Sequence, residues 1–303
     1  MPTSSLPIRG LVAAAHTPFH KDGALNLAVV EKQAAHLLAN GITIVFIAGS
    51  TGESHSLSAD ERRALTQRWI EVTRGTALRV IVHVGSNCLT DAAALARQAQ
   101  DLGALAVAAL TPSYFKPASV ASLVDCCAKV AGAAPALPFY FYDIPALTNV
   151  SLSMPEFLAQ AKDRIPNLAG IKFTNPDLMA YQLCLRAENG RFDIPWGSDE
   201  ALLGALAVGA RGAVGSSYNF GAPIYHKLIA SFQKGDLAAA REQQFLSVRL
   251  IQTLAKYGYI GAAKAVMGML GVDVGPARLP NRNPTEEERS SLRRELEPFA
   301  LIP

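Results

Sequence analysis

Short apolar segments alternate with longer segments of helical periodicity over the first two thirds of the chain. The short segments are continuously apolar rather than alternating, which is typical of parallel strands covered by helices. Eight β-α units in this order favour a closed α/β (β/α)8 barrel, a TIM barrel, and leave an open doubly wound sheet as the alternative. The predicted strands are Leu11–Phe19, Ile42–Ala48, Arg79–Gly85, Leu105–Thr111, Pro138–Ile144, Leu168–Thr174, Phe192–Gly197 and Gly212–Tyr218.

The strand pattern stops before residue 224, and the rest of the chain has helical periodicity interrupted by glycines and prolines. We therefore predict a barrel domain with the active site over residues 1–223 and a C-terminal helical region over residues 224–303. The predicted helices there are Ile224–Gln233, Asp236–Tyr257, Ile260–Leu270 and Glu286–Phe299.

Composition narrows the class of protein. The chain has 303 residues, is 50% hydrophobic and carries a net charge of +3 without a long basic run, so neither nucleic acid nor a membrane is an expected partner. No segment reaches the roughly 20 apolar residues of a membrane span, and Met1–Gly10 does not resemble a signal peptide or an anchor. The four cysteines show neither metal spacing nor a CxxC pattern, which predicts a reduced, cytoplasmic setting.

Metal chemistry has little support in the sequence. The six histidines form no HExxH motif and have no cysteine partners at metal-binding spacing, so no metal site and no cofactor are expected. His83 lies in an apolar strand and is predicted to be a hydrogen-bonded core histidine.

Active-site groups of such a barrel lie at the carboxyl ends of strands and in the loops that follow. Lys172 is the one lysine of ten that falls inside a predicted apolar strand. Burial of an ammonium is costly, which favours the neutral amine that attacks a ketone to form an imine. The alternative is a lysine that pairs with a carboxylate or reaches solvent at the strand end.

The segment Gly49–Glu53 follows the second predicted strand and reads Gly-Ser-Thr-Gly-Glu. Its two glycines permit a tight turn with exposed N–H groups, and Ser50 and Thr51 add hydroxyl donors. Such a loop suits a carboxylate or a phosphate. The alternative is simply the start of the next helix, where Ser56 or Ser58 before Glu61 forms a cap.

Tyr142 lies near the end of the fifth predicted strand, on the same face as Tyr140 because strand side chains alternate. A tyrosine at this position can relay protons. The alternative is an aromatic residue of the core.

A further polar group follows the seventh and eighth predicted strands. Gly197, Asp199 and Glu200 belong to one segment and Ser216 to the other, and together they could bind a polyol. The alternative is that the two carboxylates begin the next helix, where negative charge interacts favourably with the helix dipole.

In this order the motifs resemble the dihydrodipicolinate synthase / N-acetylneuraminate lyase family over nearly the whole chain. They are Gly-Ser-Thr-Gly-Glu, Thr-Pro-Ser-Tyr, Tyr-Asp-Ile-Pro-Ala-Leu-Thr, Gly-Ile-Lys-Phe-Thr, Gly-Ser-Asp-Glu and Gly-Pro-Ala-Arg-Leu-Pro. The resemblance implies an enzyme, a Schiff-base lyase that acts on pyruvate and an aldehyde or sugar acid as a homotetramer.

The resemblance also implies a role for each matching residue. Lys172 would form the imine with the pyruvate ketone, and Ser50 and Thr51 would hold its carboxylate. Tyr142 would move the proton that drives bond cleavage, and Tyr114 would complete the relay, often from a neighbouring subunit. The positions that match substrate contacts are Thr174, Gly197, Asp199, Glu200 and Ser216.

The branch of the family follows from the substrate-binding motifs. The stretch Ala146–Thr148 lacks the arginine that the synthase branch uses for a second carboxylate, and the Ser-Asp-Glu motif is similar to the lyase branch. The implied reaction is cleavage of N-acetylneuraminate to pyruvate and N-acetylmannosamine. Asp143 and Asn149 depart from the lyase pattern, which usually has asparagine or histidine at the first and glycine at the second.

Three other functions remain open at this point. A dihydrodipicolinate synthase-like enzyme, or an aldolase or dehydratase for another 2-keto sugar acid such as 2-keto-3-deoxygluconate, would share the imine. A non-catalytic keto-acid sensor would not need the tyrosine relay.

Overall fold

The computed structural model describes residues 7–302, which form two compact units. Unit 1 comprises residues 7–10, 79–198 and 204–214, and unit 2 comprises residues 11–78, 199–203 and 215–302. The first six residues of the Met1–Gly10 segment lie outside the described residues.

Unit 1 is built on parallel strands in the order β3-β4-β5-β6, each paired with the next along the chain. Every residue of β4, β5 and β6 is buried, in agreement with the continuous apolar pattern. The strands are β3 (Arg79–His83), β4 (Ala106–Leu110), β5 (Phe139–Asp143) and β6 (Leu168–Phe173).

The seventh predicted strand is shorter than expected. Instead of a continuous strand over Phe192–Gly197, isolated parallel bridges join Asp193 to Gly170 and Trp196 to both Phe173 and Ala213 of β7 (Gly212–Gly215). Pro195 lies between the two bridged residues and has no N–H to donate to a ladder. The segment nevertheless continues the parallel order beyond β6.

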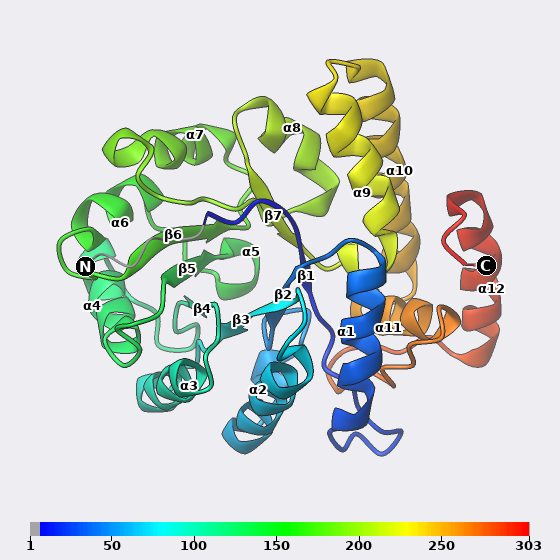
Figure 1. Ribbon diagram of the computed structural model, residues 1–303, viewed down its shortest axis with the longest axis horizontal. Coiled ribbons are helices and arrows are strands. Elements are labelled where there is room, and N and C mark those ends of the chain that lie inside the picture. Colours follow the sequence, from blue (N-terminus) through cyan, green and yellow to red (C-terminus); the bar gives the residue numbers. More distant parts are fainter. Residues whose placement is uncertain (1–6, 303) are drawn as a thin grey trace. The chain divides into compact units, whose positions relative to one another are not determined.

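Helices of unit 1 pack beside one another along the strands, with α3 against α4, α4 against α6 and α6 against α7 (Figure 1). Each buries an apolar stripe of helical period; α4, for example, buries Val120, Leu123, Val124 and Cys127. The elements are α3 (Leu89–Asp101), α4 (Val120–Ala131), α5 (Pro145–Thr148), α6 (Met154–Ala161), α7 (Leu178–Arg186) and the 3-10 helix η3 (Ala187–Gly190).

Unit 2 contains the parallel pair β1 (Gly10–Ala14) and β2 (Ile44–Ile47) and most of the remaining helices. Helices α9 and α10 run side by side (Figure 1). The other elements of the chain are η1 (Leu27–Val29), α1 (Val30–Ala39), η2 (Ser54–Ser56), α2 (Ala59–Thr73), η4 (Asp199–Ala201), α8 (Leu202–Ala207), α9 (Tyr218–Gln233), α10 (Leu237–Lys256), α11 (Tyr259–Met269), α12 (Glu286–Leu296) and η5 (Glu297–Phe299).

Helix α9 begins six residues earlier than predicted, at Tyr218 rather than Ile224, because Pro223 does not break it. A proline in a helix leaves the carbonyl four residues earlier without its donor. That carbonyl, of Asn219, is 2.8 Å from His36 Nε2 and is satisfied there. The predicted eighth strand therefore ends at Gly215 instead of Tyr218.

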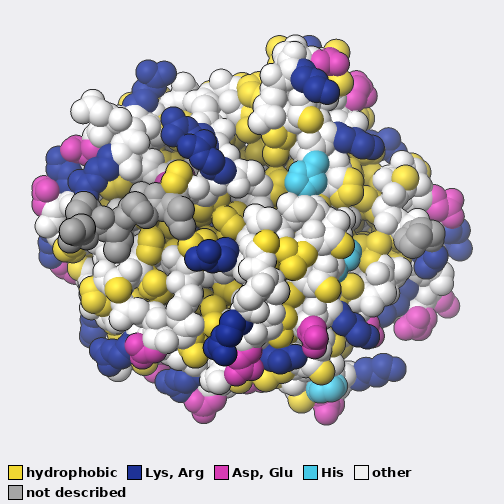
Figure 2. Space-filling model, viewed as in Figure 1, with side chains coloured by type: hydrophobic (Ala, Val, Ile, Leu, Met, Phe, Trp, Pro, Cys, Tyr) yellow, Lys and Arg dark blue, Asp and Glu magenta, His cyan; other side chains and the backbone are white. Residues whose placement is uncertain are grey.

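The surface of the described residues shows no strong segregation of charge on the face in Figure 2, where basic, acidic and apolar side chains are interspersed. Within residues 7–302, no helix combines the length and apolar character that a membrane span requires. No cluster of three or more metal-ligating His, Cys, Asp or Glu side chains occurs in the same part of the chain.

Candidate active site

Lys172 and Tyr142 lie side by side at the carboxyl ends of β6 and β5. The two residues are direct partners in the parallel register, so their side chains leave the sheet on the same face. Lys172 Nζ is 3.8 Å from the centroid of the Tyr142 ring. Only 5% of Lys172 and 3% of Tyr142 is exposed, so the amine is presented to the ring in a largely dry environment.

Asp143 points to the opposite face of β5. Its Oδ2 accepts a hydrogen bond from Asn175 Nδ2 at 3.0 Å. Burial, followed by the charge of Asp143, raises the pKa of the Cys184 thiol on α7. Burial raises the pKa of Asp143 itself to about 6, and the Asn175 hydrogen bond opposes that rise. This departure from the lyase pattern therefore lies away from Lys172, among the covering helices.

Tyr140 serves the packing of the strands rather than proton transfer. Its hydroxyl donates to Asp193 Oδ2 at 2.8 Å, and the same oxygen accepts from the backbone N–H of Ile8 at 2.7 Å. Burial, followed by the charge of Asp193, raises the pKa of Tyr140. Of the two tyrosines predicted on this face, only Tyr142 is placed against Lys172.

His83 is a core histidine, as predicted. It is buried, its Nε2 accepts from the backbone N–H of Leu110 at 3.3 Å, and its ring meets Tyr142 edge-on with centroids 5.9 Å apart. The ring thus packs against the Tyr142 side chain from within the sheet.

Thr174 and Gly197 are in close contact just beyond the ends of their strands. The Gly197 N–H donates to the carbonyl of Phe173 at 2.8 Å, and a Cβ added to Gly197 would lie 1.8 Å from Thr174 Oγ1. Residue 197 must therefore be glycine for its backbone to lie this close to the Thr174 side chain. Thr174 Oγ1 is buried and has no hydrogen-bond partner within residues 7–302, which is costly for a hydroxyl unless a ligand supplies one.

Tyr114 is not brought against Lys172. Its ring is 79% exposed and packs edge-on against Phe115 with centroids 5.0 Å apart. Asn87 Oδ1 accepts hydrogen bonds from the N–H groups of Ser113 and Tyr114 at 2.8 and 3.0 Å, so the loop is ordered although its aromatic tip is exposed.

In unit 2, Ser50 and Thr51 lie in the tight loop that follows β2. The left-handed backbone conformations fall on Ala48 and Glu53, with φ of 53° and 56°, and not on the glycines as the sequence suggested. Gly49 and Gly52 are needed instead for close packing, since a Cβ on Gly49 would lie 2.5 Å from the Phe46 ring. The capped start of the next helix is also present, with Ser58 and Glu61 forming a capping box.

Asp199 is buried beneath Gly215, where a Cβ would lie 1.8 Å from Asp199 Oδ1. Asp199 Oδ2 accepts from the N–H and the hydroxyl of Ser217 at 2.9 and 2.5 Å. Glu200 is exposed, and both residues begin the 3-10 helix η4, so the predicted helix start is confirmed. The Ser216 hydroxyl is 2.8 Å from that of Tyr259 on α11.

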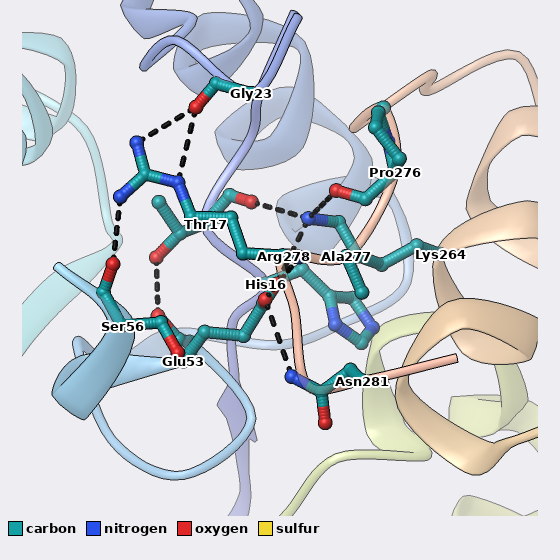
Figure 3. Close-up of polar contacts among 12 residues, drawn as sticks. His16, Thr17, Gly23, Glu53, Ser56, Lys264, Pro276, Ala277, Arg278 and Asn281 are labelled. Carbon is teal, nitrogen blue, oxygen red and sulfur yellow. Dashed lines mark hydrogen bonds and ion pairs between the residues drawn. The ribbon is translucent and has the colours of Figure 1, made fainter. Parts of the chain in front are cut away.

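Sequence reasoning missed a second buried lysine, Lys264, and its partner Glu53 (Figure 3). Lys264 lies on α11, whose residues from Gly261 to Met267 are all buried. A lysine inside a helix that is apolar all round was the signal that could have found it.

The predicted site residues are divided between the two units. Unit 1 contains Lys172, Tyr142, Thr174, Gly197 and the exposed Tyr114, and unit 2 contains the others.

Residues 7–298 match the dihydrodipicolinate synthetase family. The N-acetylneuraminate lyase of Gallus gallus is 39% identical over 294 residues, which are 96% of this chain and 96% of that protein.

Two solved structures give the same result. The chain is similar to the N-acetylneuraminate lyase of Proteus mirabilis, with a TM-score of 0.95 and 38% identity over 98% of this chain and 100% of the other. It is equally similar to the enzyme of Aliivibrio salmonicida, with a TM-score of 0.95 and 40% identity over 98% of both chains. The predicted fold class, a (β/α)8 TIM barrel with a C-terminal helical extension, is confirmed by these likenesses.

Proposed function

Since this chain belongs to the dihydrodipicolinate synthetase family, we propose that it is a class I aldolase that cleaves N-acetylneuraminate to pyruvate and N-acetylmannosamine. The observation that carries the proposal is the buried Lys172 amine, 3.8 Å from the Tyr142 ring at the carboxyl ends of two adjacent strands. The substrate rests on the relatives named N-acetylneuraminate lyase, at 35–40% identity.

In this mechanism the Lys172 amine attacks the ketone carbon of the open-chain sugar acid and water leaves, which yields a protonated imine. The iminium nitrogen withdraws electrons when the carbon–carbon bond breaks. The electron pair of that bond becomes the enamine, and the aldehyde of N-acetylmannosamine departs. Protonation of the enamine carbon and hydrolysis of the imine then release pyruvate and restore Lys172.

Tyr142 is the base in this scheme. Bond cleavage requires removal of the proton from the hydroxyl on the carbon that becomes the aldehyde. The Tyr142 oxygen accepts that proton while the tyrosine's own hydroxyl proton passes to the carboxylate of the substrate. General acid–base help of this kind contributes about 10²- to 10⁴-fold to rate. Tyr114 would assist from a neighbouring copy of the chain.

Substrate binding is divided among the remaining residues. Ser50 and Thr51 bind the carboxylate through hydroxyl and backbone N–H groups. The Thr174 hydroxyl, buried without a partner among the described residues, is suited to a hydroxyl of the substrate. Gly197, Asp199, Glu200 and Ser216 match the positions assigned to the sugar's hydroxylated tail.

A homotetramer in the cytoplasm completes the proposal. Apolar and aromatic side chains as exposed as Tyr114 and Phe115, at 79% and 86%, are typical of surfaces that a second chain covers. The exposed ring of Tyr114 is then the part of the relay that crosses to a partner.

Borohydride reduction in the presence of pyruvate tests the imine. We expect mass spectrometry to locate one reduced pyruvate adduct on Lys172, and Lys172→Ala to abolish it. Lys162→Ala, at a partly exposed lysine paired with Glu188, is the matched control and should leave the adduct unchanged. An adduct elsewhere, or none in the native chain, would contradict the mechanism.

Pyruvate release across a substrate panel tests the second substrate. We expect release from N-acetylneuraminate to exceed release from 2-keto-3-deoxygluconate, and no condensation of pyruvate with aspartate semialdehyde. Faster turnover of either alternative would assign the chain to another branch of the family. Imine formation without turnover of any substrate would indicate a keto-acid sensor.

A further inference from the structure

Lys264 and Glu53 form an ion pair that is sealed from solvent in unit 2. Their side chains are 0% and 1% exposed, and Lys264 Nζ lies 3.0 Å from Glu53 Oε1. The ammonium also donates to the carbonyls of Thr17 and Pro276 at 2.9 and 2.7 Å, so all three of its N–H donors are used (Figure 3). Burial lowers the pKa of Lys264 to about 8, against the Glu53 carboxylate, which raises it.

The second oxygen of Glu53 holds the segment after α11. It accepts from the backbone N–H of Arg278 at 2.7 Å and from Asn281 Nδ2 at 3.4 Å. Arg278 in turn donates to the carbonyls of Gly23 and Ser56, and its guanidinium lies 4.2 Å from the centroid of the Phe19 ring. These contacts come from the C-terminal part of the chain and converge on the segments that follow β1 and β2 (Figure 3).

Glu53 is also the residue that closes this loop. It has a left-handed backbone, and its N–H donates to the carbonyl of Ser50 at 3.0 Å. The Thr17 hydroxyl donates to the Gly52 carbonyl at 2.7 Å from the other side. A non-glycine residue persists in this conformation only when its surroundings over-determine it, and here the buried carboxylate does so.

His16 completes the packing around the loop. It is buried, and burial followed by the charge of Lys264 lowers its pKa to about 3. The imidazole is therefore neutral at physiological pH and adds no second positive charge beside Lys264.

A buried ion pair contributes little net stability, because desolvation offsets most of its attraction. Its retention is better explained by the geometry that it imposes. We propose that Glu53 and Lys264 are positioning residues that fix the Ser50–Thr51 loop in the conformation needed to bind the carboxylate of the keto acid. The C-terminal helical region thereby takes part in substrate recognition through α11 and the segment of Arg278, without touching the substrate.

This inference rests on the proposed function, and its test separates the two. Borohydride-trapped adduct is measured against increasing pyruvate, which has a carboxylate, and against increasing acetone, which forms the same imine without one. The variants are Glu53→Gln, which keeps the side-chain size and removes the negative charge, Lys264→Met, which removes the positive charge, and Lys264→Arg, which keeps it. Lys256→Met is the matched control, because it breaks an exposed ion pair with Glu295 in the same C-terminal region.

For Glu53→Gln we expect the pyruvate concentration at half-saturation to rise about tenfold, and that for acetone to stay within about twofold. Lys264→Arg should retain much of the pyruvate affinity, and Lys256→Met should match the native chain. If Glu53→Gln raises the half-saturation concentrations of pyruvate and acetone equally, or raises neither, the positioning role is wrong. If Glu53→Gln does not fold, Lys264→Met, which removes the cation, takes its place, with the same expected rise for pyruvate and not for acetone. Failure of the native chain to trap pyruvate would instead overturn the proposed function.

Discussion

Three buried ionisable residues of this chain differ in their neighbours, and their roles follow from that difference. Lys264 is surrounded by three oxygens, Asp143 by one amide, and Lys172 by an aromatic ring. The three N–H donors of Lys264 are all satisfied by oxygens, which suits a structural role, whereas the Lys172 amine faces an aromatic ring at the carboxyl end of a strand, which suits the proposed imine. Burial alone therefore does not identify a Schiff-base lysine.

The pair of tyrosines on β5 gives a matched test of proton transfer. Tyr142→Phe should lower turnover of N-acetylneuraminate by about 10²- to 10⁴-fold, with much less effect on borohydride trapping of pyruvate. Tyr140→Phe removes a hydroxyl two residues away on the same face but leaves Asp193 without that donor, so it should reduce stability more than turnover. Equal loss of trapping and turnover in Tyr142→Phe would contradict its role as the base.

Asp143 makes stability depend on pH. Its folded-state pKa is raised to about 6 from 3.8, so the folded chain binds more protons than the unfolded chain between these values, and stability falls as pH rises through this window. Asp143→Asn removes the free-energy cost of burying a charged carboxylate at this position. At pH 7 the variant should unfold with a free energy higher by up to about 3 kcal/mol, and the gain should vanish below pH 3.8. Chemical denaturation at several pH values measures this, and a gain that does not depend on pH would show that the charge is not the cause.

At the scale of elements, the predicted start of α2 is correct and the predicted start of α9 is wrong. The predicted cap of α2 is present, with Ser58 Oγ accepting from Glu61 N at 3.1 Å and Glu61 Oε2 accepting from Ser58 N at 2.9 Å. Helix α9 was predicted to begin at Ile224 but begins at Tyr218 and continues through Pro223, because His36 satisfies the carbonyl that the proline leaves open. The cap of α2 forms between residues three positions apart, so the sequence reveals it. The continuation of α9 through Pro223 depends on His36, which lies more than 180 positions away in the chain.

The cap of α2 can be tested by two substitutions at one position. Ser58→Ala should lower the free energy of unfolding by about 1 kcal/mol, because the first turn loses a side-chain acceptor, and Ser58→Gly should lower it by only a few tenths. Urea denaturation of the two variants and the native chain provides the comparison. A larger loss for glycine than for alanine would mean that the side chain contributes through packing instead of capping.

At the scale of the whole molecule, the exposed Tyr114 predicts that active sites are completed between copies of the chain. Tyr114→Phe and Lys172→Ala should each be nearly inactive alone. When the two variants are mixed and allowed to exchange subunits, about a quarter of the sites of a paired assembly regain both residues. About a quarter of the activity of the native assembly should therefore return.

Analytical ultracentrifugation under the same conditions checks the assembly. A monomer in solution would exclude this arrangement. An active Tyr114→Phe variant would remove Tyr114 from the relay, whatever the oligomeric state.

The sequence by itself determined the fold class and indicated Lys172 as the candidate for the imine lysine. Both are local properties, because apolar strand segments and helical periodicity can be recognised within a few tens of residues, and a lysine in an apolar strand stands out against its neighbours. The sequence predicted the ends of the strands less accurately than their order. The predicted seventh strand reduces to isolated bridges, since pairing depends on a partner strand and on Pro195.

Only the tertiary structure showed what each polar residue contacts. It placed Asp143 away from Lys172, gave Tyr140 a structural partner, and joined Glu53 to Lys264 across 211 positions of the chain. Sequence patterns report the direction of a side chain within its own element but not what lies opposite. The chemistry of a buried group depends on those opposite atoms, because in a dry environment each charge and hydroxyl is governed by the partners within hydrogen-bonding distance.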